Sequence, residues 1–369
     1  MKTRSGAGAR RQMRSRLMAA GRLRKRQQTR GKSKPRRKPA GKTRQMMLDL
    51  HPFRRAGRLA GKQFQADVDL PDKHASQAWQ AYAAELPELD SVGAALQAGS
   101  AFMQGYAQTS GRASDIVPLP LRHAAAAVVC ACNEERTLGQ VLRQLRRLPL
   151  RDIVVVLNGT TDNSLGHVLQ HPGITLVYEP DRAGHDVGRA LGVKMTDAET
   201  VLFVDGDMVV PAEQLAPFLF TIDRGQDVAL NDLTSLLPPF AKQDEVSRIK
   251  AYLNHTLGRR DLGSNSMTAV PHAVSRRMIQ AVKPASLAVP PMAQMLAVQQ
   301  GLQVSAPYQV DVIRSNRLRP GNTGRGNDVA RLILGDHLEA LAAWLERNTN
   351  AVQANTPSRT EVAYRRNAR

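Results

Sequence analysis

The chain has 369 residues, of which 42% are hydrophobic and 4% aromatic, and its formal net charge is +20. This length allows one or two domains with a sizeable core, and no apolar run approaches the roughly 18–20 residues of a membrane span. The only cysteines, Cys130 and Cys132, are poorly placed to bridge each other and lack a zinc pattern, so we expect reduced side chains in a cytoplasmic protein.

The positive charge is concentrated at the N-terminus. Residues 1–45 contain 18 lysines and arginines and no acidic residue, whereas the rest of the chain has 34 basic and 32 acidic residues. A segment with so much charge and so little apolar content is predicted to be a disordered tail. We expect it to bind polyanions, such as nucleic acid or the surface of an acidic membrane, in a salt-dependent way. A solubilising arm without a specific target is an equal alternative.

Residues 46–122 are predicted to form a helical extension and a linker. The segments 78–86 and 92–106 are rich in alanine, leucine and glutamine and have a helical composition. Residues 111–120 contain turn-forming residues and lead into the next part of the chain. We expect the extension to pack on the main domain or on a partner.

From residue 123 the pattern alternates between strands and helices. Apolar runs predict strands at 125–131, 153–157, 174–178 and 201–204, with helices at 135–148 and 184–195 between them. Unbroken apolar strands are typical of a parallel sheet covered on both faces. The sequence therefore predicts an α/β fold with right-handed crossovers, and its ligands should bind beyond the carboxyl ends of the strands.

Two aspartates follow the fourth predicted strand and are the strongest candidates for a metal site. The run 201–204 ends in Asp205-Gly206-Asp207. Buried carboxylates need a partner, and Mg²⁺ or Mn²⁺ accepts a few carboxylate oxygens together with water and substrate phosphates. A polar turn without a ligand is the simpler alternative for this segment alone.

Two further polar loops are expected at the same edge of the sheet. Cys132-Asn133-Glu134 follows the first predicted strand, and Asn158 opens the loop after the second. Because parallel strands have their carboxyl ends at one edge, these loops should converge on the aspartates. The convergence favours a ligand site more than any single loop does.

The order and spacing of five segments resemble those of family 2 glycosyltransferases. The segments are 128–135, 154–164, 182–192, Asp205-Gly206-Asp207 and 263–270, and the resemblance covers about residues 124–305. It implies the GT-A fold, a Rossmann-like, mixed and mostly parallel sheet flanked by helices. We therefore expect a GT-A domain over 123–310 and a C-terminal loop, helix and tail over 311–369.

The resemblance also implies a function and a set of site residues. It implies transfer of a sugar from a nucleotide-diphospho-sugar to an acceptor that the sequence does not identify, with Mn²⁺ or Mg²⁺ as cofactor. Asp207 would bind the metal directly, and Asp205 would bind it through water or hold the ribose. The other expected donor-binding residues, for the nucleoside and then for the diphosphate, are Asn133, Glu134, Asn158, Arg182 and Arg189.

One part of the family pattern is missing, and it leaves the catalytic residues unknown. The segment where the family carries a Glu-Asp general base reads Ala288-Val289-Pro290-Pro291-Met292, and proline cannot take a proton. Asp261 or Asp311 could act instead, or the enzyme retains configuration and needs no such base. The alternative function is a catalytically degenerate GT-A-fold binding protein, tethered to polyanions by its tail. Histidines 255, 272 and 337 could each complete a metal site, but their spacing selects none.

Overall fold

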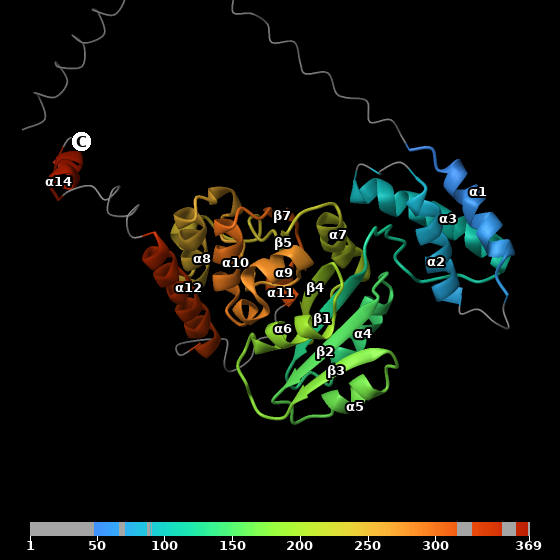
Figure 1. The fold of residues 1–369 in the computed structure, drawn as a ribbon, viewed down its shortest axis with the longest axis horizontal. Coiled ribbons are helices and arrows are strands. Elements are labelled where there is room, and N and C mark those ends of the chain that lie inside the picture. The colour runs from blue at the N-terminus through green and yellow to red at the C-terminus, as the bar shows by residue number, and fades with distance from the viewer. Residues whose placement is uncertain are drawn as a thin grey trace, which may run out of the picture. The chain divides into compact units, whose positions relative to one another are not determined.

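The computed structural model describes residues 48–65, 71–86, 89, 91–315, 327–348 and 359–367. The predicted disordered tail, residues 1–45, lies outside the described residues. Figure 1 shows a central sheet with helices on both faces and three helices that precede the sheet in the chain. The division of the chain at residues 45, 122 and 310 stays a prediction.

The secondary structure follows the predicted alternation of strands and helices. The three preceding helices are α1 (His51–Lys62), α2 (Pro71–Ala84) and α3 (Val92–Ser110). The strands are β1 (Ala125–Ala131), β2 (Asp152–Asn158), β3 (Ile174–Glu179), β4 (Thr200–Asp205), β5 (Val228–Asn231), β6 (His272–Ser275) and β7 (Val304–Tyr308). The remaining α-helices are α4 (Leu138–Arg146), α5 (Ser164–Leu169), α6 (Val187–Gly192), α7 (Ala212–Asp223), α8 (Glu245–Thr256), α9 (Arg276–Val282), α10 (Pro290–Gln299), α11 (Val312–Ser315), α12 (Asp328–Arg347) and α14 (Arg359–Asn367). None of the helices in these described ranges combines the length and hydrophobicity needed to cross a bilayer.

The seven strands form one sheet in the order β3-β2-β1-β4-β6-β5-β7. Strand β6 runs antiparallel to its neighbours β4 and β5, and every other pair is parallel. The expected mixed, mostly parallel sheet flanked by helices is therefore confirmed. Its order places β2, β1 and β4 side by side, so the ends of these strands share one edge.

Two hydrophobic cores lie on the two faces of the sheet. On one face Val129 and Leu202 pack with residues of α4, α5 and α7. On the other face Val128 and Phe203 pack with residues of α6, α9 and α10. Successive side chains of a strand point to opposite faces, so unbroken apolar strands supply both cores at once.

Helix α6 is shorter than the predicted helix over 184–195. It covers Val187–Gly192 and continues into a short 3₁₀ turn over Val193–Met195. The residues before it stay outside the helix because the Asn158 side chain binds the backbone of Ala183 and Gly184. Gly184 also has a φ of 130°, a conformation that ends helical geometry.

The first three helices have a small core of their own, as a helical extension requires. Phe53 of α1, Trp79 of α2 and Phe102 of α3 are buried together there. Helices α1 and α3 approach each other at glycines. A Cβ on Gly105 would lie 2.1 Å from the Arg54 carbonyl oxygen, and one on Gly57 would lie 1.9 Å from the Phe102 carbonyl oxygen. Only residues without a side chain allow this contact between backbones.

Replacing Gly105 by alanine should therefore destabilise the helical extension. A methyl group overlapping a backbone carbonyl forces the helices apart, and overpacking of this kind lowers the free energy of unfolding by about 1–3 kcal/mol. The matched control is Gly93→Ala in the same helix, where the nearest atom to the added Cβ is 3.8 Å away. It should leave stability unchanged or raise it by up to about 1 kcal/mol. Urea denaturation measures both, and equal effects would contradict the close approach.

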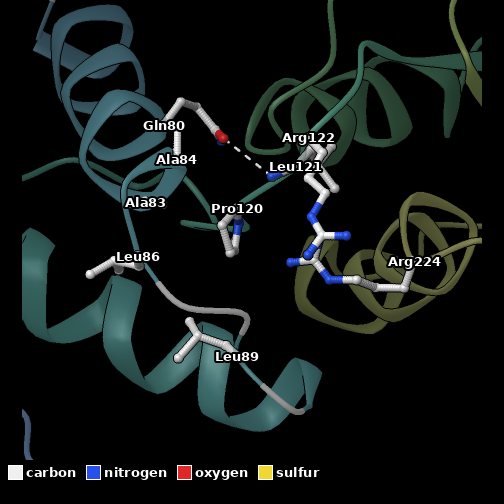
Figure 2. A pocket seen from close by; sticks show the side chains of 9 residues that line it. All are labelled: Gln80, Ala83, Ala84, Leu86, Leu89, Pro120, Leu121, Arg122 and Arg224. Atoms are coloured by element: carbon white, nitrogen blue, oxygen red, sulfur yellow. Dashed lines mark hydrogen bonds between the residues drawn. The ribbon is translucent and has the colours of Figure 1, made fainter.

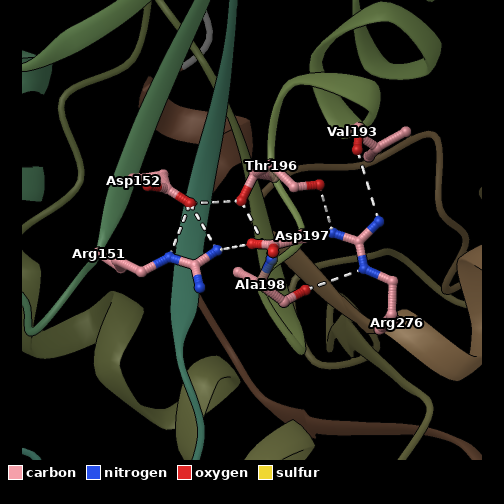
Figure 3. Close-up of polar contacts among 7 residues, drawn as sticks. All are labelled: Arg151, Asp152, Val193, Thr196, Asp197, Ala198 and Arg276. Atoms are coloured by element: carbon pink, nitrogen blue, oxygen red, sulfur yellow. Dashed lines mark hydrogen bonds and ion pairs between the residues drawn. The ribbon is translucent and has the colours of Figure 1, made fainter.

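A polar network joins the amino-terminal ends of the strands, at the edge opposite the candidate site (Figure 3). The Arg276 guanidinium donates hydrogen bonds to the carbonyls of Val193, Thr196 and Ala198. Arg151 pairs with Asp152 and Asp197 in the same network. These contacts tie the start of α9 to the segment that enters β4, and so support the strand that carries the candidate aspartates.

His272 is fully buried between the sheet and its covering helices. Its ring stacks on Phe203 with centroids 4.9 Å apart, and its Nδ1 lies 2.9 Å from the Ala269 carbonyl oxygen. Burial, followed by the charge of Arg189, lowers the pKa of His272 to about 3. The imidazole is therefore neutral in the folded protein.

Protein stability should fall as the pH drops below 6.5, the ordinary histidine pKa, toward 3, because the unfolded chain gains a proton that the folded chain excludes. Between pH 7 and pH 5 the free energy of unfolding of wild type should fall by about 2 kcal/mol more than that of His272→Phe. Urea denaturation of both proteins at the two pH values measures the difference. Equal losses would contradict a neutral, buried His272.

Candidate functional site

The carboxyl ends of β2, β1 and β4 meet at one edge of the sheet. Cys130 of β1 is in register with Val156 of β2 and with Asp205 of β4. The loops that follow these strands therefore begin side by side, with Asn133 after β1 and Asn158 at the end of β2. This edge therefore brings together the loops that contain the site residues predicted from the sequence.

The turn Asp205-Gly206-Asp207 is held to β1 and to the segment before α4. The amide of Gly206 donates to the Cys130 carbonyl at 2.8 Å, and the Thr137 hydroxyl donates to the Gly206 carbonyl at 2.8 Å. A Cβ on Gly206 would lie 2.6 Å from the Cβ of Ala131, so no larger residue fits. Both aspartates are half-buried, which leaves part of each carboxylate accessible.

The Asp205 carboxyl is in an environment that disfavours its charge. Burial raises its pKa to about 6, and the nearby charges of Asp207 and Asp186 act in the same direction, against that of Arg189. A bound cation would favour the ionised form of such a group.

The donor set at this edge suits a hard divalent cation. Within the described ranges no group of three or more histidine, cysteine, aspartate or glutamate side chains converges. Mg²⁺ and Mn²⁺ are bound by one or two carboxylates plus substrate phosphates rather than by an all-protein cage. Asp205 and Asp207 fit that requirement. Of the three candidate histidines, His272 and His337 are buried, and His255 lies beside Arg260.

Arg189 lies beneath this edge and is 4% exposed. Its guanidinium pairs with Asp186 at 3.2 Å and donates to the Met267 carbonyl at 2.8 Å. Its charge acts on Asp205 and stabilises the ionised carboxylate. The expected contact with a diphosphate stays a prediction for a side chain that is already committed to Asp186.

Asn133 and Glu134 connect the loop after β1 to the loop after β2. Asn133 has a φ of 59°, and its Oδ1 accepts from the Thr161 and Asp162 amides at 2.7 and 3.2 Å. Glu134 is buried, and its amide donates to the Ser164 hydroxyl at 2.8 Å. Both residues thus shape the site edge, and their role in nucleoside binding stays a prediction.

Asn158 and Arg182 organise the segment that precedes α6. The Asn158 Nδ2 donates to the Gly184 carbonyl at 2.6 Å, and its Oδ1 accepts from the Ala183 amide at 2.9 Å. Arg182 is exposed, and its guanidinium approaches the Cys132 sulfur at 3.7 Å. The amide of Asn158 therefore already uses a donor and an acceptor, which limits what remains for a nucleobase.

Replacing Asn158 by aspartate should loosen the segment 182–186. The carboxylate keeps the acceptor for the Ala183 amide but cannot donate to the Gly184 carbonyl, so one hydrogen bond of about 1 kcal/mol is lost. We expect hydrogen exchange of the amides at 182–186 to become faster while exchange in β1 stays unchanged. Unchanged exchange at 182–186 would show that Asn158 does not hold this segment.

The segment 263–270 is positioned by a buried amide network. The Asn254 side chain donates to the carbonyls of Gly263 and Asn265 at 2.9 Å, and Gln294 links Asn254 to the Met267 amide. Pro290, the first residue of α10, is buried at the point where a general base was sought. Asp261, one of the two alternatives, pairs with Arg259 at 2.7 Å. No base is identified among these residues.

Sequence reasoning missed two charged residues near this edge. Asp186 acts on the pKa of Asp205, and Lys250 of α8 is within range of Asp186 and Arg189. The spacing of Asp186 and Arg189, three residues apart at a helix start, was a usable signal for an ion pair. Lys250 carries no such signal, because its place depends on how α8 packs.

Two cavities of the described structure lie elsewhere, beside α2. One, of about 410 Å³, is lined by α2 residues, by residues 120–122 and by Arg224 (Figure 2). The other, of about 390 Å³, is lined by α2 residues and by residues near the start of β2. Neither is lined by a candidate site residue, and the sheet edge differs from both in its carboxylates and in the convergence of its polar loops.

Comparison with known proteins finds one family model, which matches residues 126–279 of this chain. This model is described as glycosyl transferase family 2. No curated protein matches the chain. Solved structures of glucosyl-3-phosphoglycerate synthase from Mycobacterium tuberculosis are similar, among them the complex with Mn²⁺, uridine diphosphate and phosphoglyceric acid (18% identity, TM-score 0.45, 59% of this chain and 78% of that chain). The complex with Mg²⁺ and uridine diphosphate has 17% identity and a TM-score of 0.44, over 59% of this chain and 79% of that chain. Similarity at this level carries no information about what this chain binds.

Proposed function

We propose that the chain transfers a sugar from a nucleotide-diphosphate donor to an acceptor, because residues 126–279 match the model of glycosyl transferase family 2. The observation that carries the proposal is the turn Asp205-Gly206-Asp207, which lies within the family match at the shared ends of β1, β2 and β4. A parallel sheet binds its ligand at such an edge.

Asp207 would hold Mn²⁺ or Mg²⁺, with Asp205 binding the ion through water or holding the ribose. When bound, the cation neutralises the charge that develops on the leaving phosphate. The positive charge of Arg189 favours the ionised form of Asp205. The hydrogen bond from the Gly206 amide to the Cys130 carbonyl of β1 fixes the direction of the turn. These residues orient the donor before any bond breaks.

The loops after β1 and β2 would bind the rest of the donor. Asn133, Glu134 and Asn158 would line the nucleoside position. The exposed guanidinium of Arg182 would bind the diphosphate, which it matches in charge and geometry. Because Asn133 and Asn158 already hold neighbouring backbone, they would act mainly by fixing the loops.

The second candidate function is a catalytically degenerate binding protein of the same fold. Its support is the buried Pro290 and Pro291 at the start of α10, in place of an acidic general base. Donor hydrolysis or transfer that depends on Asp207 would exclude it. Binding of a nucleoside diphosphate without any turnover would support it.

The basic residues at the N-terminus would bind a polyanion. Residues 1–45 carry 18 positive and no negative side chains, and α1 adds Arg54, Arg55, Arg58 and Lys62 without an acidic residue. This charge would attract a polyanion and could hold a cytoplasmic enzyme at an acidic membrane surface.

Metal-dependent nucleotide binding tests the proposed function. Calorimetry with UDP, GDP and ADP in turn, each with Mn²⁺, should identify one nucleoside diphosphate that binds wild type. Asp207→Asn should lower the affinity for this nucleotide at least tenfold, because one negative charge that binds the metal is lost. Omitting the metal should have a similar effect. Asp72→Asn, an exposed position on α2, is the matched control and should bind as wild type does. The function is wrong if no nucleoside diphosphate binds with Mn²⁺ or Mg²⁺.

A further inference from the structure

The cavity of about 410 Å³ beside α2 lies away from the candidate site. One wall comes from the end of α2 and the residues that follow it, and the other from residues 120–122 and from Arg224, directly after α7 (Figure 2). Residues 120–122 lead into the amino-terminal end of β1, whereas the candidate site lies at the carboxyl ends of the strands. The volume is typical of small-molecule sites, which span roughly 300–1,000 Å³.

Two arginines line this cavity, and Figure 2 shows that their guanidinium groups point toward one another. Arg122 is exposed. The Arg224 side chain is 16% exposed, and its guanidinium carbon lies 4.5 Å from the centroid of the Phe220 ring. Among the described residues that line the cavity, none is acidic. A pair of like charges at one cavity favours an anion as its ligand.

A buried carboxylate outside the lining fixes the position of both arginines. Asp223 accepts hydrogen bonds from the backbone amides of Arg122 and His123 at 2.9 and 3.0 Å. It also pairs with the Arg224 guanidinium at 2.9 Å. The contact to Arg122 uses its backbone and not its guanidinium. A guanidinium has five donors, so one that pairs with a carboxylate can still donate to a second anion.

The rest of the cavity wall is mostly apolar. Apart from the arginines and Gln80, the lining residues are Ala83, Ala84, Leu86, Leu89, Pro120 and Leu121. The Gln80 Nε2 donates to the Leu119 carbonyl at 2.7 Å, and its Oε1 accepts from the Leu121 amide at 3.2 Å (Figure 2). These bonds commit the Gln80 amide to joining α2 to the segment before β1. A ligand that fits this wall has a negative group at one end and apolar surface elsewhere.

We propose that this cavity is a second ligand site, which binds a small anion that carries a short hydrocarbon or aromatic group. The phosphate or carboxylate of the ligand would accept hydrogen bonds from Arg122 and Arg224, since both groups present oxygen atoms that match a guanidinium. The apolar group would pack on Leu86 and Leu89. This site goes beyond the proposed transfer reaction and does not depend on it.

Calorimetry with octyl phosphate and with octanoate, each below its micelle-forming concentration, tests the proposal. At least one of the two should bind wild type. Octanol has no charge and inorganic phosphate has no hydrocarbon chain, so each should bind at least tenfold more weakly than the tighter octyl anion. Wild type that binds neither octyl anion overturns the proposal, and so does inorganic phosphate or octanol that binds as tightly as they do.

A pair of arginine variants places the anion in the cavity. Arg122→Gln removes the guanidinium and keeps the backbone amide that binds Asp223, so its melting temperature should stay close to that of wild type. It should bind the octyl anion about tenfold more weakly, because a hydrogen bond to a charged group is lost. Arg112→Gln makes the same change at an exposed position outside the cavity and should bind as wild type does.

A second pair of variants tests the same site without removing an arginine. Ala84→Glu places a carboxylate in the wall of the cavity, and Ala81→Glu makes the same change at an exposed position of α2 that does not line it. Ala84→Glu should bind the octyl anion at least tenfold more weakly, because its charge repels the anion and attracts the arginines. Ala81→Glu should bind as wild type does. In either pair, equal affinity of the cavity variant and its control overturns the proposal.

Discussion

The arrangement of the candidate site depends on a buried positive charge beneath a carboxylate. Arg189 is held by Asp186 and by the Met267 carbonyl, and its charge opposes the effect of burial on Asp205. Without this positive charge, the pKa of the Asp205 carboxyl would be raised further, because burial and the neighbouring carboxylates both disfavour its ionised form. The arginine also joins two parts of the chain, since α6 follows β3 while Met267 belongs to the segment before β6. One ion pair therefore supports both the charge and the shape of the sheet edge.

The side chains at this edge combine binding potential with structural roles. Asn133 holds the loop after β2, Asn158 holds the segment before α6, and Thr137 holds the aspartate turn. Each loop is thus fixed by a polar residue from another loop. These hydrogen bonds between loops hold the polar groups in place before a ligand binds, which favours recognition of a charged ligand. It also means that a substitution at any of these positions acts on the neighbouring loops as well as on the ligand.

The strand pattern was readable in advance because of hydrophobic periodicity. Unbroken apolar runs predict strands that are buried on both faces, and β1, β2 and β4 have that environment. The helix over 184–195 was predicted too long, since its composition is helical but Asn158 captures the backbone at Ala183 and Gly184. A local sequence pattern cannot include a hydrogen bond formed across 25 residues. The roles of Asn133, Asn158 and the aspartates in binding stay predictions.

The sequence alone determined the alternation of strands and helices, the two-sided burial of the sheet, and the polar loops at the strand ends, because each of these follows from local periodicity. The tertiary structure decided which charges meet. Lys250 and His337 are brought together by the packing of α8 against α12, and Arg189 is committed to Asp186 under Asp205. Electrostatic interactions act through space between residues that are distant in the chain, so no reading of neighbouring residues could have found them.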